Sequence, residues 1–414
     1  MQSPKCVMIA GIILMLSFAA NSQTNAVAPA PQASAPAAAP AAAPPAAPTA
    51  LPTPSITGPL SGLPPAMFDA GPFGKIAVNG ILDGQGTLTG NYVPGDNNTQ
   101  AALSNGQVFI QKTDGVFQFY VQAGAYNLTS LGTPFLPTDQ AITNLYGPVP
   151  VAFVKLQAGK NTSIEIGSLP TLIGAEYTFS FENMNIERGL LWNQETAISR
   201  GIQLNQTMGK FSASLSWNDG FYSNRYSWLS GSLAYTNGPH ALAFVAGGNA
   251  GATSSQTFAT PIQNDGSIYN VIYTYSKGSW ILQPYWQYTS VPTNAKFGVG
   301  NGASTDGFAL LLSHAFAHGF SFPVRFEYIS SSGSAAAKSV NLLYGPGSAA
   351  TSFTVTPTFQ QGGFFVRGDV SYVHLSSMAK GAGFGQFGAS SGQPRAMVEF
   401  GFMFGNNIVE TAKK

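Results

Sequence analysis

The sequence predicts an all-β protein, a transmembrane antiparallel up-and-down β-barrel of about 16 strands (roughly 14–18) with one loop folded inward. Three observations predict this class. Charged residues form 8% of the 414-residue chain, against about 25% in ordinary soluble proteins. The mean hydropathy is nevertheless only +0.08. From residue 74 onward, apolar and polar residues alternate with a period of two, which is the period of a strand with two different faces.

A barrel in lipid explains the low charge and the neutral hydropathy together, because every second residue faces lipid and the others face a polar interior. The alternative is a soluble sandwich or solenoid, but such proteins usually carry more surface charge. The net charge is +1, and the only basic block is Lys413 and Lys414. This composition argues against a phosphate-neutralising surface, so no nucleic-acid partner is expected.

Residues 1–26 are typical of a signal peptide. Lys5 precedes an apolar stretch from Val7 to Ala20 that only Ser17 interrupts. This stretch is too short to span a bilayer comfortably, since a helical span needs about 20 residues, and an uncleaved anchor is the less favoured alternative. Cys6, the only cysteine, would be removed with the peptide, so the mature chain would have no disulfide and no thiolate metal site. Secretion into the bacterial outer membrane is therefore expected.

Residues 27–74 are expected to form an Ala/Pro-rich disordered linker. Alanine and proline fill 17 of the 20 positions in 31–50. Because proline blocks helix and sheet pairing and alanine buries little surface, we expect an extended tether that projects into the periplasm. A passive spacer is favoured over contact with periplasmic components.

The barrel itself is predicted over residues 75–414. In 321–328, apolar residues such as Phe326 and Tyr328 share one face, and Arg325 and Glu327 share the other. The runs at 364–373 and 396–404 alternate in the same way. A charge facing lipid near the bilayer midplane costs about 2–4 kcal/mol, so charged residues belong on the inner face. The pore-lining residues predicted on this basis are Arg325, Glu327, Arg367, Asp369 and Glu399.

The width of the barrel predicts a channel. The longer runs reach about 9–11 residues, enough for a tilted strand to cross a bilayer. At about 20 residues per strand and connection, residues 75–405 hold about 16 strands. Barrels of 16–18 strands leave an aqueous channel, which predicts passive diffusion of small polar solutes or ions. Porins of this size commonly form trimers, so a homotrimer is an open expectation.

Residues 170–200 break the alternation. Four glutamates lie here, in a chain otherwise poor in charge. The segment is too polar for lipid and too long for a turn. It is either a loop folded into the lumen, where carboxylates and arginines would select solutes by charge, or an external loop that meets water. The residues of the predicted constriction are Glu176, Glu182, Glu187, Arg188, Glu195 and Arg200.

Motifs in this segment resemble a known family. They are Gly174-x-Glu176-Tyr177, Asn183-x-Asn185, the run from Arg188 to Asn193, and Ser199-Arg200-Gly201. These are similar to the central motif of the putative β-barrel porin-2 (OmpL-like) family, and the similarity extends loosely over about 75–405. The resemblance implies an outer-membrane barrel acting as a porin, and it favours the lumen position of 170–200. One departure is that the last aromatic strand ends at Phe404, ten residues before the end of the chain.

No catalytic pattern stands out. His314 and His318 are four residues apart, which would suit a metal only on a helix, and their surroundings favour a surface pair near a turn. No G-x-S-x-G or H-E-x-x-H motif is present. We therefore expect no enzyme, no cofactor and no metal. The alternatives to an open channel are a closed or plugged barrel that binds a surface or partner and, less favoured, a barrel hydrolase using carboxylates of 170–200.

Overall fold

A computed structural model describes residues 53–251 and 261–406. The predicted signal peptide and residues 27–52 of the predicted linker lie outside the described residues.

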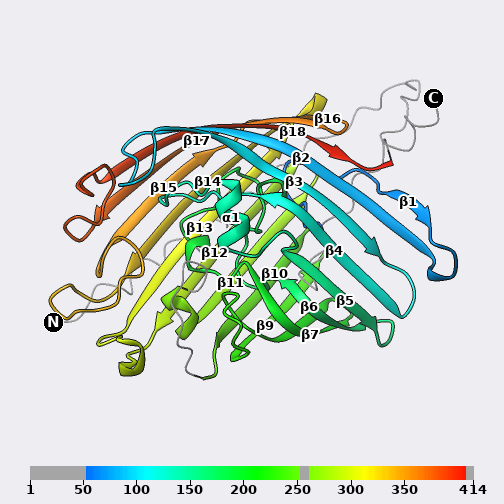
Figure 1. The fold of residues 1–414 in the computed structure, drawn as a ribbon, viewed down its shortest axis with the longest axis horizontal. Helices are drawn as coiled ribbons and strands as arrows, with labels where there is room; N and C mark the ends of the chain where they lie inside the picture. Colours follow the sequence, from blue (N-terminus) through cyan, green and yellow to red (C-terminus); the bar gives the residue numbers. More distant parts are fainter. Residues whose placement is uncertain (1–52, 252–260, 407–414) are drawn as a thin grey trace, which may run out of the picture. The chain divides into compact units, whose positions relative to one another are not determined.

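The strands that follow residue 74 form one antiparallel sheet that closes on itself (Figure 1). Each strand pairs with its neighbours in the chain, and the last strand, β18, pairs with β2 to close the ring. The strands are β2 (Lys75–Thr89), β3 (Thr99–Lys112), β4 (Phe117–Tyr126), β5 (Val151–Gln157), β6 (Thr162–Pro170), β7 (Ile198–Met208), β8 (Phe211–Asn218), β9 (Trp228–Asn237), β10 (His240–Asn249), β11 (Ser267–Lys277), β12 (Trp280–Val291), β13 (Ala303–Ala315), β14 (Phe320–Ser331), β15 (Ala349–Val355), β16 (Thr358–Gln361), β17 (Phe364–Ser377) and β18 (Gly392–Phe404).

The barrel has 16 strands, because β15 and β16 are two halves of one strand. Both halves pair with β14 on one side and with β17 on the other. Pro357 stands between them. Proline has no N–H group to donate to the sheet, so it interrupts the ladder at this point. The predicted fold class, a closed antiparallel barrel of about 16 strands, is confirmed.

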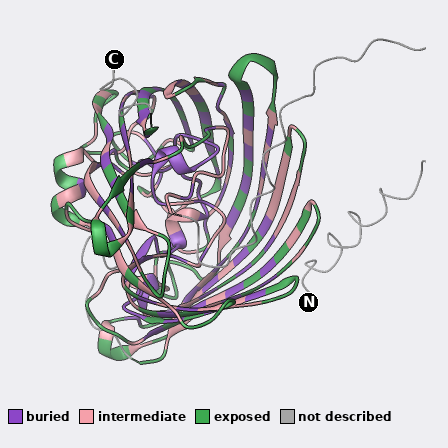
Figure 2. Cartoon of the chain, turned by 90° about the vertical axis from the view of Figure 1, so that its right-hand side faces the viewer, coloured by how far each residue is buried: buried purple, intermediate pink, exposed green. Residues whose placement is uncertain are grey.

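The two faces of each strand differ as the alternation predicts (Figure 2). On β14 the side chains of Arg325 and Glu327 are fully buried, whereas Phe326 and Tyr328 are 44% and 42% exposed. Aliphatic and aromatic side chains stand outward in the same way on the other strands, such as Val398 and Phe400 on β18. Lipid would cover this outer face. The inward positions carry the charged side chains, and they also include buried apolar ones such as Ile272 on β11 and Leu311 on β13, which belong to the hydrophobic core.

The two ends of the barrel carry different connections. Short hairpins join β7 to β8, β9 to β10, β11 to β12 and β16 to β17. Long connections lie at the other end, including 127–150, which contains α1 (Thr138–Asn144), and 171–197. The connection from β8 to β9 spans 219–227, and Gly220 within it lies close to the side chains of Asn264 and Trp228. None of the helices in the described ranges has the length and apolarity needed to cross a bilayer.

Residues 53–74, expected to belong to the disordered linker, differ from that expectation. Ser55 and Leu60 are buried, and β1 (Ala66–Asp69) pairs with the first residues of β2. This stretch contains larger apolar side chains, whereas the part before it is mainly alanine and proline. The larger side chains provide apolar surface that can be buried against the barrel. The barrel domain therefore includes residues before position 75.

Candidate functional site

The connection 171–197, called the internal segment below, lies inside the ring of strands. Apart from the short 3₁₀ turns η3 (Ser180–Glu182) and η4 (Trp192–Gln194), it has little regular structure. Its backbone groups therefore need partners from elsewhere. Inward-facing side chains supply them: the Ile186 N–H donates to Asp369 Oδ2 at 3.1 Å, and the Leu190 N–H donates to Glu327 Oε2 at 2.9 Å.

Arg325 on β14 holds the middle of the internal segment. Its guanidinium lies 2.5 Å from Glu176 Oε1 and donates to the Glu187 carbonyl at 2.6 Å. Glu327, two residues along the same strand face, lies 3.4 Å from Arg325 Nε and also accepts from the Leu191 N–H at 3.1 Å. The wall residue and the segment residue thus satisfy each other's charges where both side chains are almost fully buried.

Arg367 on β17 holds a second part of the segment through its carbonyl groups. It donates to the carbonyls of Ser180, Asn183 and Met184 at 2.9, 2.8 and 2.8 Å. The same guanidinium lies 3.2 Å from Glu399 on the neighbouring strand β18. The Ser180 hydroxyl in turn donates to Glu399 at 2.6 Å, so the pair and the segment form one hydrogen-bonded unit.

Arg395 on β18 makes the third attachment, and the sequence analysis missed it. Its Nη1 lies 2.5 Å from Glu187 Oε1 and also donates to the Ser130 carbonyl at 3.1 Å. Ser130 belongs to the 127–150 connection, which forms a parallel bridge with the segment at Arg188. A signal for Arg395 existed, because it shares the polar face of β18 with Glu399, four residues along.

Two charged groups of the segment have no hydrogen-bond partner among the described residues: the guanidinium of Arg188 and the carboxyl of Glu195. Arg188 is fully buried, with its Cζ atom 5.4 Å from the centre of the Trp192 ring. Burial lowers the pKa of Arg188 to about 10, although Glu176, Glu399 and Glu187 oppose this shift. Burial also raises the pKa of Glu195 well above its usual range, and the nearby charges of Glu176 and Glu327 add to the effect.

Glu182 connects the internal segment to the residues that precede the barrel strands. Its carboxylate accepts from the Phe179 N–H at 3.1 Å and from the Ser55 N–H at 3.0 Å. Burial raises the pKa of Glu182 to about 7, and the two backbone hydrogen bonds and Arg188 act in the opposite direction.

Arg200 is the residue of the predicted constriction that lies apart from this network. It sits on β7, pairs with Asp219 at 2.8 Å, and stacks on Tyr222 with 3.9 Å from Cζ to the ring centre. The other predicted residues of both groups meet in or beside the network. We call the residues that join wall and segment the charged network; they are Glu176, Glu187, Arg325, Glu327, Arg367, Asp369, Arg395 and Glu399.

The charged network consists of ion pairs and hydrogen bonds. Each carboxylate of the charged network accepts hydrogen bonds from arginine, backbone or hydroxyl donors, so none is placed as a free acid or nucleophile. Within residues 53–251 and 261–406, no three His, Cys, Asp or Glu side chains meet in a way that could hold a metal ion. His314 lies on β13 with its ring centre 4.1 Å from that of Trp280, and His318 lies in the following turn.

A closed 16-strand barrel, apolar outside and charged inside, with a long connection folded into it, has the architecture of a bacterial outer-membrane porin. The family comparison agrees. The chain belongs to the family described as "Putative beta-barrel porin-2, OmpL-like", whose model matches residues 75–404. The resemblance seen in the sequence is thereby confirmed.

Solved structures share the fold at low sequence identity. The outer membrane channel DcaP of Acinetobacter baumannii is 9% identical, with a TM-score of 0.55, over 83% of this chain and 100% of DcaP. In-vitro folded OmpT, an outer membrane protein of Vibrio cholerae, is 10% identical, with a TM-score of 0.54, over 81% and 98%. Salmonella typhi OmpF, in a complex with daunomycin, is 12% identical, with a TM-score of 0.51, over 80% and 98%. No curated protein matches the chain.

Proposed function

We propose that this protein is a porin that forms a water-filled channel for passive diffusion of small polar solutes, narrowed by the internal segment. The observation that carries the proposal is the attachment of that segment to the wall by arginines of three strands, β14, β17 and β18. A loop held this way reduces the width of a barrel that its own wall side chains cannot fill.

Arginine suits this role because it stays charged at all physiological pH values and offers several N–H donors in a fixed plane. Arg367 uses this geometry to hold three carbonyl groups at once. The segment's carboxylates meanwhile bring negative charge into a confined place with low dielectric, where a passing ion experiences them strongly. Glu176 and Glu187 are the residues that we expect to influence ion preference.

The test is single-channel recording of the full chain in a planar bilayer under a salt gradient. We expect stepwise openings, and we expect the combined changes Glu176→Gln and Glu187→Gln to shift the reversal potential toward anion preference. Asp114→Asn is the control, because Asp114 lies in an exposed turn and pairs only with Lys112 among the described residues. Protein that inserts into the bilayer but never conducts would contradict the open-channel proposal and favour the closed, surface-binding barrel.

A homotrimer is part of the proposal, by analogy with porins of this width. Size-exclusion chromatography with light scattering in detergent would measure the mass of the particle. A protein mass of one chain per particle would contradict the proposed trimer and leave the channel proposal unaffected.

A further inference from the structure

Residues 53–65, called the entry segment below, are folded into the barrel before the first strand begins. Leu60 is 2% exposed and packs in one apolar cluster with Phe109, Phe181 and Met403. Ile56 and Leu63 pack against the same cluster. The wall supplies Phe109 and Met403, and the internal segment supplies Phe181, so the entry segment lies between the two.

The entry segment runs from one part of the wall to another. At its start, Thr53 and Ser55 line a small cavity together with Gln122, Val151 and Pro170 of β4, β5 and β6. At its end, Ser61 and Gln360 exchange two hydrogen bonds of 2.7 and 2.8 Å. Gln360 lies on β16 beside a short hairpin, whereas Val151 and Pro170 are the residues of β5 and β6 next to the long connections. The segment therefore crosses the lumen obliquely, and only its end lies near the short hairpins.

The middle of the entry segment rests on the internal segment. The Ser55 N–H and the Thr57 hydroxyl donate to the carboxylate and the carbonyl of Glu182, at 3.0 and 3.4 Å. Gly58 approaches so closely that a Cβ atom there would stand 2.8 Å from the Asn183 carbonyl oxygen. Real Cβ atoms do not come within that distance of backbone, so this contact requires glycine at position 58.

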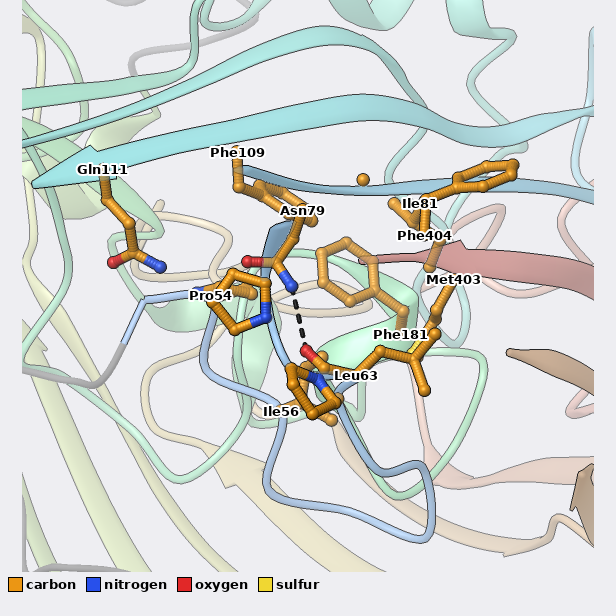
Figure 3. A pocket seen from close by; sticks show the side chains of 14 residues that line it. Pro54, Ile56, Leu63, Asn79, Ile81, Phe109, Gln111, Phe181, Met403 and Phe404 are labelled. Carbon is orange, nitrogen blue, oxygen red and sulfur yellow. Dashed lines mark hydrogen bonds between the residues drawn. The ribbon is translucent and has the colours of Figure 1, made fainter. Parts of the chain in front are cut away.

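The contact with the wall is incomplete (Figure 3). A pocket of about 450 Å³ remains between the entry segment and strands β2, β3 and β18. Its lining is mainly apolar, with Asn79 and Gln111 as the polar side chains, and the Asn79 amide donates to the Leu63 carbonyl at 2.9 Å across its edge. A segment with an open space on one side loses fewer packing contacts when it moves than one enclosed on all sides.

We propose that residues 53–65 are an internal plug that narrows the channel, and that solute flow increases when the plug leaves its seat. The plug is a second barrier, separate from the internal segment, and the inference rests on the proposed channel function. Both barriers meet at Glu182 and Asn183, so a plug in place also braces the internal segment.

The experiment locks and releases the plug in the full chain. The variant carries Ser61→Cys and Gln360→Cys together with Cys6→Ser. A short thiol-specific cross-linker that contains a disulfide joins positions 61 and 360, and a reductant later cleaves that disulfide. We expect reduction to raise the mean single-channel conductance by about 1.5-fold or more, since the channel widens when the plug leaves. The control is the pair Lys210→Cys and Asn237→Cys, whose side chains meet at 2.7 Å on hairpins that do not contact the plug. Reduction should change nothing there.

A second variant displaces the plug without a cross-link. Gly58→Val places atoms against the Asn183 carbonyl, whereas Gly300→Val, its control, enters open space. We expect Gly58→Val alone to raise conductance. We also expect it to make Leu60→Cys, protected in the parent, react with a polyethylene glycol maleimide.

Equal conductance of the locked and released forms would overturn the plug and leave the channel standing. Absence of any current while Leu60→Cys reacts in the Gly58→Val background would show a displaced plug in a barrel that does not conduct. That outcome would overturn the proposed function and the plug's role with it.

Discussion

Arg325 on β14 and Glu176 in the internal segment form an ion pair of 2.5 Å in which neither side chain is more than 1% exposed. The pair joins the wall of the barrel to a residue 149 positions earlier in the chain. Because it lies among other buried charges, its loss affects both the stability of the barrel and the position of the segment.

We expect Arg325→Gln to destabilise the barrel by about 3–5 kcal/mol, because it leaves Glu176 and Glu327 as buried carboxylates without their cation. Urea unfolding of the refolded protein in lipid vesicles measures this loss. Combining Arg325→Gln with Glu176→Gln should cost less than the sum of the two single changes. Arg225→Gln, at an exposed position, serves as the control. Strict additivity of the two changes would show that the pair contributes no coupling energy.

Gly189→Ala tests how tightly the internal segment is held. A Cβ atom at this position would stand 2.1 Å from Glu327 Oε1 and 2.7 Å from Glu176 Oε2. The carboxylates that accept from the Gly189 and Leu190 N–H groups would have to move, so we expect a loss of about 1–3 kcal/mol. Gly300→Ala meets no neighbouring atom and should be neutral in the same unfolding assay. A neutral Gly189→Ala would mean that the segment shifts freely.

Glu182 predicts a pH dependence of stability. Its pKa is about 7 in the folded protein, above the ordinary value of 4.5, so the folded state binds the extra proton. The stability that this proton contributes is fully present below the ordinary value and is lost as the pH rises through about 7. Glu182→Gln cannot lose a proton. The melting temperature of the variant minus that of the wild type should therefore increase from about pH 5 to about pH 8. A difference that stays constant with pH would contradict the raised pKa.

Val398→Arg tests the membrane-facing side of the barrel. Val398 is 47% exposed on β18, between inward-facing Met397 and Glu399. A charge on the lipid face costs about 2–4 kcal/mol near the midplane. We expect lower folding yield into vesicles, and we expect Asn97→Arg, in an exposed connection, to fold normally. Unchanged folding of Val398→Arg would place this part of β18 outside the hydrocarbon layer.

The strand pattern was readable because it depends on neighbours in the chain. A residue such as Arg325 faces opposite to Phe326 in any strand, and lipid outside the barrel then decides which of the two faces inward. The ion pair of Arg200 and Asp219 could not be read in this way. Arg200 lies on β7 and Asp219 follows β8, and only the pairing of β7 with β8 brings the two together.

The charged network could be predicted in part. An excess of glutamates in a chain poor in charge marked the internal segment, and the polar faces of two strands marked Arg325 and Arg367. The partner of each charge could not be read from the sequence, since Glu187 and Arg395 are 208 positions apart. The position of residues 53–65 was also beyond the sequence, because proline-rich composition indicates extended chain but does not show what surface that chain will meet.

The sequence alone is thus enough to establish the class of fold, the inward and outward faces of the strands, and the segment with the excess of charged residues. These follow from local periodicity and from the energetic cost of placing charge in lipid. The folded structure was needed to show that Arg395 completes the charged network, that Arg200 lies outside it, and that the entry segment contacts Glu182. Such contacts join residues that are not neighbours in the chain, and strand pairing and the folding of the two segments into the barrel bring them within hydrogen-bonding distance.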